Sequence, residues 1–246
     1  MMWTQDGAAV VVGGTGGIGA AITRLLVKRG SDVLITYRSN INAANALIAE
    51  SGGKVRALQL DITDENAVAH LEAIGAIRTL VYAAGPLVRQ RHLSKVAPSE
   101  LRSTLIDDAV GFFTVVRATL PALRESGGSI VAVTSAAGRR YAVRDGLSVI
   151  PKASVEAIVT GIAVEEGRFG VRANCVGPGM LADGMARSLI AAGDLDEAAL
   201  EAAKRNTPLR RFGTAHDIAE AVVFLASSQA NFITGQKLDV DGGYGA

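Results

Sequence analysis

The stretch VVVGGTGGIGAAI, from Val10 to Ile22, decides the fold of this protein. Its valines belong to a short apolar, β-branched run of the kind that forms buried strands in parallel sheets. The glycines that follow allow a tight turn into a helix, whose first backbone N–H groups can meet a pyrophosphate. A turn that serves only to join strand and helix is the alternative. We expect a dinucleotide-binding turn formed by Gly13, Thr15, Gly17, Ile18 and Gly19.

Short apolar runs alternate with longer segments of helical periodicity along the rest of the chain. This alternation is typical of βαβ units, whose right-handed crossovers place helices over both faces of a parallel sheet. The sequence therefore predicts the α/β class, as a Rossmann-type doubly wound parallel sheet with helices on both faces. The strands are expected at residues 8–13, 32–37, 55–60, 78–83, 129–134, 171–176 and 235–241. The helices are expected at 18–30, 41–51, 65–75, 101–125, 155–170 and 216–228.

Length and composition favour one domain over two. The chain has 246 residues, of which 49% are hydrophobic and 20% charged, enough to bury a large core. We expect a single domain over residues 1–246. One mostly helical insertion, from Met180 to Arg211, follows the sixth strand, and such a segment at the carboxyl edge suits a substrate lid. A helical elaboration without a catalytic part is an equal alternative.

Charge and cysteine content limit the classes of binding partner and the cellular compartment that we expect for this protein. Lys and Arg total 25 against 24 Asp and Glu, which gives no basic field for nucleic acid. The single cysteine, Cys175, excludes an internal disulfide or a CxxC metal motif and fits a reducing compartment. No apolar stretch reaches the ~18 residues of a membrane span, and no charged n-region opens the chain, so we expect a cytoplasmic protein. Three histidines without metal-ligand spacing are expected at the surface, namely His70, His92 and His216.

The end of the second expected strand bears on cofactor choice. An NAD-selective site places a carboxylate there for the ribose 2′-hydroxyl, whereas this chain has Arg38 and Ser39. A guanidinium is a planar, permanent cation suited to a 2′-phosphate, so NADP(H) is favoured over NAD(H). An exposed arginine in a loop is the alternative. Asp61, followed by Ile62, closes the third strand and is expected to accept from the adenine amino group, with helix capping as its alternative.

With these residues in view, the chain resembles the short-chain dehydrogenase/reductase family over nearly its whole length. Within the family, its general likeness is to 3-oxoacyl-carrier-protein reductases. The resemblance implies nicotinamide binding and a homo-oligomer, a tetramer or dimer, built on the helices that carry Asp108 and Lys152. It rests on the glycine turn, Asp61, Ala83, Ala84, Gly85, Ser135, Lys152, Pro178, Gly179 and residues 217–244.

The resemblance also implies catalytic roles. In the family, a serine polarises the carbonyl, a tyrosine transfers the proton, a lysine holds the nicotinamide ribose, and an asparagine anchors a relay water. Ser135 and Lys152 match the serine and the lysine. Ser148 stands where the tyrosine is expected, four residues before Lys152, and Asp108 stands where the asparagine is expected. The usual NNAG segment is YAAG here, residues 82–85.

The replacement by Ser148 changes the acid chemistry. A phenol has a pKa of about 10 that a neighbouring ammonium can lower, whereas an alkyl hydroxyl is a far weaker acid. Loss of a positioned general acid typically costs about 10² to 10⁴ in rate. Tyr141 and Tyr82 are possible substitutes, although packing or surface roles are favoured for both. Asp108 has three open interpretations: an ion pair with Lys152, a proton carrier, or a solvated helix carboxylate.

Three hypotheses of function follow. The first is an NADP(H)-preferring oxidoreductase that interconverts a carbonyl and a secondary alcohol of a small molecule, with non-standard proton delivery. The second is a cofactor-binding protein without its own reaction, acting as a sensor or partner subunit. The third is a single Tyr→Ser change at position 148 of an ordinary reductase, against which Asp108 and the YAAG segment argue. We favour the first because most of the cofactor apparatus is present.

Overall fold

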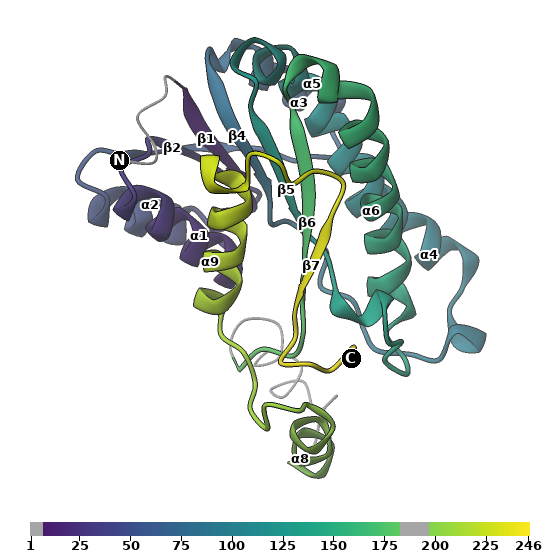
Figure 1. The fold of residues 1–246 in the computed structure, drawn as a ribbon. Coiled ribbons are helices and arrows are strands. Elements are labelled where there is room, and N and C mark those ends of the chain that lie inside the picture. The colour runs from purple at the N-terminus through teal and green to yellow at the C-terminus, as the bar shows by residue number, and fades with distance from the viewer. Residues whose placement is uncertain (1–6, 183–196) are drawn as a thin grey trace.

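A single parallel sheet forms the centre of the molecule (Figure 1). The computed structural model describes residues 7–182 and 197–246. All strands pair in parallel in the order β3-β2-β1-β4-β5-β6-β7, which reverses direction between β1 and β4 as a doubly wound fold does. The predicted fold class is confirmed. The strands are β1 Ala8–Val12, β2 Val33–Tyr37, β3 Val55–Gln59, β4 Ile77–Tyr82, β5 Ser129–Val133, β6 Arg172–Pro178 and β7 Lys237–Val240.

Helices cover both faces of the sheet and bury two separate cores. Alternate residues of each strand point to opposite faces, so Val11 packs with Ile22 on one side while Tyr82 packs with Phe112 on the other. One face carries α1 Gly17–Lys28, α2 Ile41–Glu50 and α9 Ala215–Ala226. The other carries α3 Glu65–Ala69, α4 Pro98–Leu105, α5 Gly111–Ser126 and α6 Gly146–Glu166. Short 3-10 turns lie at His70–Ile74, Leu93–Lys95, Ala136–Gly138, Gly167–Phe169 and Ser228–Ala230.

The predicted helix over 101–125 is broken in the structure. A π-helical segment, Ile106–Val110, separates α4 from α5. Gly111 follows it, and a Cβ there would lie 2.8 Å from Cδ1 of Ile62, so the close approach requires glycine. Such π segments occur often at functional sites. Here the segment turns Asp108 into the protein interior.

Helix α6 begins earlier than its apolar pattern predicts. It starts at Gly146 rather than near residue 155 and continues through Pro151, so Ser148 and Lys152 both lie in its first turns. By length and composition alone, Gly146–Phe169 is apolar enough to cross a membrane. Here Val155 and Val159 of this helix are buried against the sheet, and the core helix of a soluble protein passes the same test.

The insertion after β6 lies at the carboxyl edge of the sheet. Its start is tied to the segment before α9, since Ala182 N donates to Gly213 O at 2.9 Å. Residues 183–196 of the predicted lid lie outside the described part. The remainder forms α8, Glu197–Asn206, which sits beyond the end of the sheet in Figure 1.

Candidate cofactor and catalytic site

The glycine turn after β1 is packed too closely for side chains. Gly13 has φ +76°, and a Cβ there would lie 2.9 Å from Ala83 O and from Ala84 N. A Cβ on Gly19 would collide with the carbonyl oxygen of Gly13. The turn therefore brings the end of β1 against the segment after β4, as the fingerprint requires.

The N-terminus of α1 is open to a ligand. Gly16 occupies the cap position and Gly17 opens the helix, and both are exposed and lack a side chain. A Cβ on Gly16 would meet only Gly13 O, at 3.5 Å. Thr15 and Ile18 flank this opening and are half-buried. The free N–H groups and the helix dipole fit a pyrophosphate, so this cradle suits a dinucleotide.

Arg38 and Asp61 border the cradle at the ends of β2 and β3. Arg38 is exposed and forms no ion pair within residues 7–182 and 197–246, and Ser39 beside it is exposed too. Asp61 Oδ1 accepts from Thr63 N at 3.0 Å and from Thr63 Oγ1 at 2.8 Å. These bonds, with the nearby Arg38 charge, lower the pKa of Asp61. Asp64 caps α3, so the capping interpretation of Asp61 is wrong.

Lys152 is the centre of the candidate catalytic site. Its Nζ donates to Ala84 O at 2.9 Å and to Asp108 Oδ1 at 3.0 Å. A Cβ on Gly85 would lie 3.2 Å from the same nitrogen, so this glycine leaves room for the ammonium. The structure therefore brings Lys152, Asp108 and the AAG segment together at the carboxyl ends of β4 and β5.

Tyr82 completes a buried polar group with Asp108 and Lys152. Its hydroxyl donates to Asp108, 3.0 Å from the main-chain oxygen and 3.1 Å from Oδ1. Lys152 Nζ also lies 5.3 Å from the centre of the Tyr82 ring. Burial, followed by the Asp108 charge, raises the pKa of Tyr82 well above 10, so its phenol stays protonated. Asp108 is buried and paired, and its interpretation as a solvated carboxylate is wrong.

The two serines lie on different elements. Ser135 follows β5, and its Oγ accepts from Ala137 N at 3.2 Å. Ser148 is half-buried on α6, where its N–H donates to Asp145 O at 3.0 Å. Pro178 ends β6, and Gly179 N donates to Val240 O at 3.0 Å. Tyr141 is 47% exposed, as a surface residue would be.

Sequence reasoning missed a charged cluster behind Ser135. Lys237 Nζ donates to Ser135 O at 2.8 Å and lies 2.9 Å from Glu156 Oε1 and 3.5 Å from Asp239 Oδ1. Desolvation raises the pKa of Asp239. Because Lys237 and Ser135 are 102 residues apart, no local pattern predicts this contact. The bond to its carbonyl fixes the position of Ser135.

Sequence reasoning also missed Asp145, at the cap position of α6. Burial raises the pKa of its carboxyl to about 6. Its side chain makes no capping hydrogen bond, although its main-chain oxygen accepts from Ser148 and Val149. The sequence feature that could have identified Asp145 is its position, an acidic residue three positions before Ser148.

Other candidate chemistry is absent from the described residues. Burial raises the pKa of the Cys175 thiol to about 12, which makes it an inert packing residue. The histidines His70, His92 and His216 are exposed, as predicted. No group of three or more His, Cys, Asp or Glu within the described ranges is placed to hold a metal ion.

Comparisons with known proteins agree with this fold. Residues 12–245 match the family model described as enoyl-(acyl carrier protein) reductase. The chain is 34% identical to the uncharacterized oxidoreductase YgfF of Escherichia coli, over 96% of this chain and 98% of that protein. It is 33% identical to 3-oxoacyl-[acyl-carrier-protein] reductase of Bos taurus, over 97% of this chain and 98% of that enzyme.

Solved structures give the same result. A short chain dehydrogenase/reductase family protein superposes with a TM-score of 0.87 and 32% identity, covering 98% of this chain and 99% of that one. ElxO with NADP bound has a TM-score of 0.87 and 26% identity, covering 97% and 99%. This chain belongs to the short-chain dehydrogenase/reductase family and is an oxidoreductase of that type.

Proposed function

We propose that this protein is an NADP(H)-preferring oxidoreductase that interconverts a carbonyl and a secondary alcohol by hydride transfer. One observation carries the proposal: the open glycine cradle at α1 and the ammonium of Lys152 meet the same AAG segment after β4. A cofactor bound along this edge would span the sheet at its reversal point, between β1 and β4.

Two residues support the preference for NADP(H), and a third suits the adenine that NAD(H) and NADP(H) share. Arg38 is exposed, unpaired within the described chain, and placed after β2, where a 2′-phosphate would lie. Ser39 adds a donor, and no carboxylate stands at the end of β2 to repel the phosphate. Asp61 remains ionised through its bonds to Thr63 and has a second oxygen for the adenine amino group. The fold neighbour ElxO was solved with NADP bound.

Separate residues of this chain would hold the cofactor and position the substrate. Bound NADP(H) supplies the hydride. Lys152, fixed by Ala84 O and Asp108, would hold the ribose with its remaining N–H. Ser135, fixed by Lys237 through its carbonyl, would donate to the substrate oxygen. Ile62, Pro178 and Gly179 would line the cofactor at the carboxyl ends of β3 and β6.

Proton delivery has to follow a route other than a phenol at position 148. Ser148 is too weak an acid to supply a proton at neutral pH without help from another group. Tyr82 is buried, remains protonated and donates to Asp108, so it does not face a substrate. Asp108 pairs with Lys152 and accepts from Tyr82, so it does not face a substrate either.

A second function is favoured by the ion pair itself. Asp108 neutralises Lys152, which in the family resemblance acidifies the tyrosine, and that tyrosine is missing here. A protein that binds NADP(H) as a sensor or a partner subunit needs neither the phenol nor the free ammonium charge. This alternative predicts tight cofactor binding without hydride transfer.

Organisation and setting are part of the proposal. We infer one domain over residues 1–246, a lid within 180–211, and a cytoplasmic enzyme for a small molecule. A homotetramer or dimer is supported by apolar side chains left exposed on the α4–α5 and α6 surfaces. These are Ile106, Val110, Phe113 and Val164.

The test compares the wild-type protein with Ser148→Tyr. NADPH oxidation is followed with ethyl acetoacetate, 4-nitrobenzaldehyde and acetoacetyl-coenzyme A, and NADPH binding is measured in parallel by fluorescence. Turnover by the wild-type protein supports the oxidoreductase. Tight binding with turnover only in Ser148→Tyr supports the binding protein. Absence of NADPH binding contradicts both.

A further inference from the structure

We propose that Asp145 is the general acid of this protein, donating the proton that the missing tyrosine would supply. The inference rests on the proposed function, since it names the proton donor of that reaction. It depends on the place of Asp145 in α6, on its surroundings and on its lack of a partner.

Asp145 and Ser148 are fixed to each other. Asp145 caps α6, and its main-chain oxygen accepts from Ser148 N at 3.0 Å and from Val149 N at 2.9 Å. Residues three apart lie on the same side of a helix, so the two side chains start from neighbouring positions in the first turn. Serine is much shorter than tyrosine, which leaves space beside it for a group from the preceding turn.

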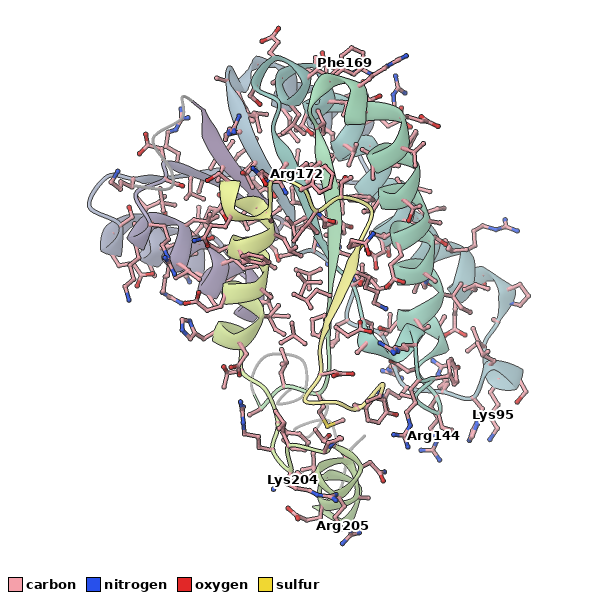
Figure 2. The ribbon with its side chains drawn as sticks, viewed as in Figure 1. Lys95, Arg144, Phe169, Arg172, Lys204 and Arg205 are labelled. Atoms are coloured by element: carbon pink, nitrogen blue, oxygen red, sulfur yellow. The ribbon has the colours of Figure 1, made fainter. Side chains whose placement is uncertain are left out.

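The segment before α6 is held in a specific position. Arg91 N donates to Arg144 O at 2.9 Å, and Arg91 and Asp145 form an isolated parallel bridge. Arg144 has φ +75°, a left-handed conformation that is unfavourable for a residue with a side chain. A Cβ on Gly146 would lie 3.0 Å from the Tyr141 hydroxyl, so this ring covers the start of the helix. Figure 2 shows Arg144 at the end of the molecule where the strands terminate, opposite Phe169.

The charged side chains near Asp145 form their hydrogen bonds and ion pairs with other residues. Arg91 pairs with Glu100, with its Nη2 3.0 Å from Oε1. Arg144 Nε donates to His92 Nε2 at 3.4 Å. Lys152, two turns further along α6, pairs with Asp108. The Asp145 carboxyl forms no hydrogen bond or ion pair with another side chain in the described ranges.

This environment gives Asp145 the properties of a general acid. Burial without a cation raises the pKa of its carboxyl to about 6, close to the pH at which a general acid works best. The nearby cations are paired or bonded to other groups, and desolvation is what raises the pKa of the Asp145 carboxyl. A protonated fraction is therefore available near neutral pH, unlike that of an ordinary aspartate.

The step balances as follows. The hydride of NADPH adds to the carbonyl carbon, the C=O π pair moves to oxygen, and that oxygen takes the Asp145 proton directly or through Ser148 Oγ. The products are the alcohol, NADP⁺ and the Asp145 carboxylate. Asp145 is half-buried, so solvent returns its proton. In the oxidation direction, the carboxylate accepts the alcohol proton.

The test is the pH dependence of kcat for NADPH-dependent reduction of ethyl acetoacetate, 4-nitrobenzaldehyde and acetoacetyl-coenzyme A. In the reduction direction, the wild-type kcat should fall about tenfold for each pH unit above the pKa of Asp145, and we call this fall the pH limb. In the oxidation direction, kcat should rise with pH until the pH reaches that pKa. Asp145→Asn should lose about 10² to 10⁴ in kcat together with this pH dependence, while NADPH affinity stays near wild type and thermal unfolding shows no loss of stability. Asp145→Glu should regain part of the rate.

Two further variants keep the result interpretable. Glu165→Gln makes the same carboxyl-to-amide change at the exposed far end of α6 and should leave both kcat and the pH limb unchanged. Adding Ser148→Tyr and Asp108→Asn to Asp145→Asn should restore turnover with a different pH dependence, because a phenol that Lys152 can acidify then supplies the proton. That recovery would show that the fold was intact.

Two results overturn the proposal. If Asp145→Asn stays within about threefold of the wild-type rate with the same pH limb, the proton comes from another group, although the oxidoreductase stands. If the wild-type protein binds NADPH but reduces none of the probes, the proposed function fails and the acid role fails with it.

Discussion

Lys152 Nζ lies 3.0 Å from Asp108 Oδ1, and the two side chains are only 12% and 3% exposed. A buried pair of this kind is locally neutral, because the carboxylate cancels much of the field of the ammonium. The ammonium field is what would acidify a phenol at position 148. Asp108 and Ser148 are therefore consistent with each other: position 148 carries a serine rather than a phenol, and Asp108 offsets the ammonium charge that would activate a phenol there.

This relationship predicts the outcome of restoring the phenol. Ser148→Tyr alone should gain little, because Asp108 still holds Lys152. Ser148→Tyr with Asp108→Asn should reduce the probe ketones up to about tenfold faster for each unit by which the pKa of the phenol falls, since the phenol is then a stronger proton donor. Steady-state rates of the two variants at pH 7 decide the point. Equal rates would show that the ion pair does not limit the phenol.

The same pair predicts a stability effect. Lys152→Met leaves the Asp108 carboxylate buried without its cation and should lower the free energy of unfolding by about 3 kcal/mol. Lys54→Met is the matched control, because its partner Asp32 is 77% exposed, and it should cost less than about 1 kcal/mol. Urea denaturation measures both. Similar losses in the two variants would contradict a buried, energetically important pair.

Arg38 predicts the cofactor preference. Arg38→Ala should weaken NADPH binding by about 10- to 100-fold, the worth of a hydrogen bond to a charged group, and leave NADH binding unchanged. Arg56→Ala removes an equal charge from the exposed side of β3 and should change neither affinity. Fluorescence titration with both nucleotides tests this. Parallel losses for NADPH and NADH would mean that Arg38 does not contact the 2′-phosphate.

Two glycines predict opposite responses to alanine. A Cβ on Gly19 would collide with Gly13 O, so Gly19→Ala should displace the turn, weaken NADPH binding and lower the melting temperature. Gly161 lies within α6, and a Cβ there would have no neighbouring atom within 4 Å. Because alanine favours a helix more than glycine does, Gly161→Ala should stabilise the protein by up to about 1 kcal/mol. Calorimetry and NADPH titration of both variants check the contrast. A stable Gly19→Ala variant with normal affinity would refute it.

Asp145 predicts a pH-dependent stability. Burial raises the pKa of the Asp145 carboxyl from its ordinary value of 3.8 to about 6, so the folded state binds the proton more tightly. Its contribution to stability is present at low pH and is lost as pH rises from about 4 to about 6. Asp145→Asn should therefore be more stable than wild type at pH 8, by at most about 3 kcal/mol, and similar at pH 4. A difference that is the same at both values would contradict a raised pKa.

The fold could be predicted from the sequence because the local patterns for strands, helices and turns all indicate the same architecture. The central strands are apolar runs that are buried on both faces, as in β5, whereas β3 and β7 are partly exposed, and the helices cover both faces of the sheet. The helix boundaries that failed depend on tertiary contacts. The break at Ile106–Val110 is followed by Gly111, which packs against Ile62, and the start of α6 ahead of Pro151 packs Gly146 against Leu93. Neither contact has a local sequence pattern.

The candidate site was readable only in part. The glycine turn, Asp61 and Lys152 lie at spacings that can be recognised in a single sequence. They could therefore be predicted as site residues without a structure. The Tyr82 hydroxyl on Asp108 and the Lys237 ammonium on Ser135 O join residues far apart in the chain. Desolvation of Asp145 is likewise a property of the packed loop at residues 86–95 and of Tyr141, which no short motif encodes.

The most direct test of the account is deuteride transfer by the wild-type protein. NADPH carrying deuterium at both hydrogen positions of nicotinamide C4 is incubated with the protein and each of the three carbonyl probes, and the alcohol is examined by mass spectrometry. The account predicts an alcohol with one deuterium on the former carbonyl carbon, formed by the wild-type protein. An unlabelled or absent alcohol, in a protein that demonstrably binds NADPH, would contradict it.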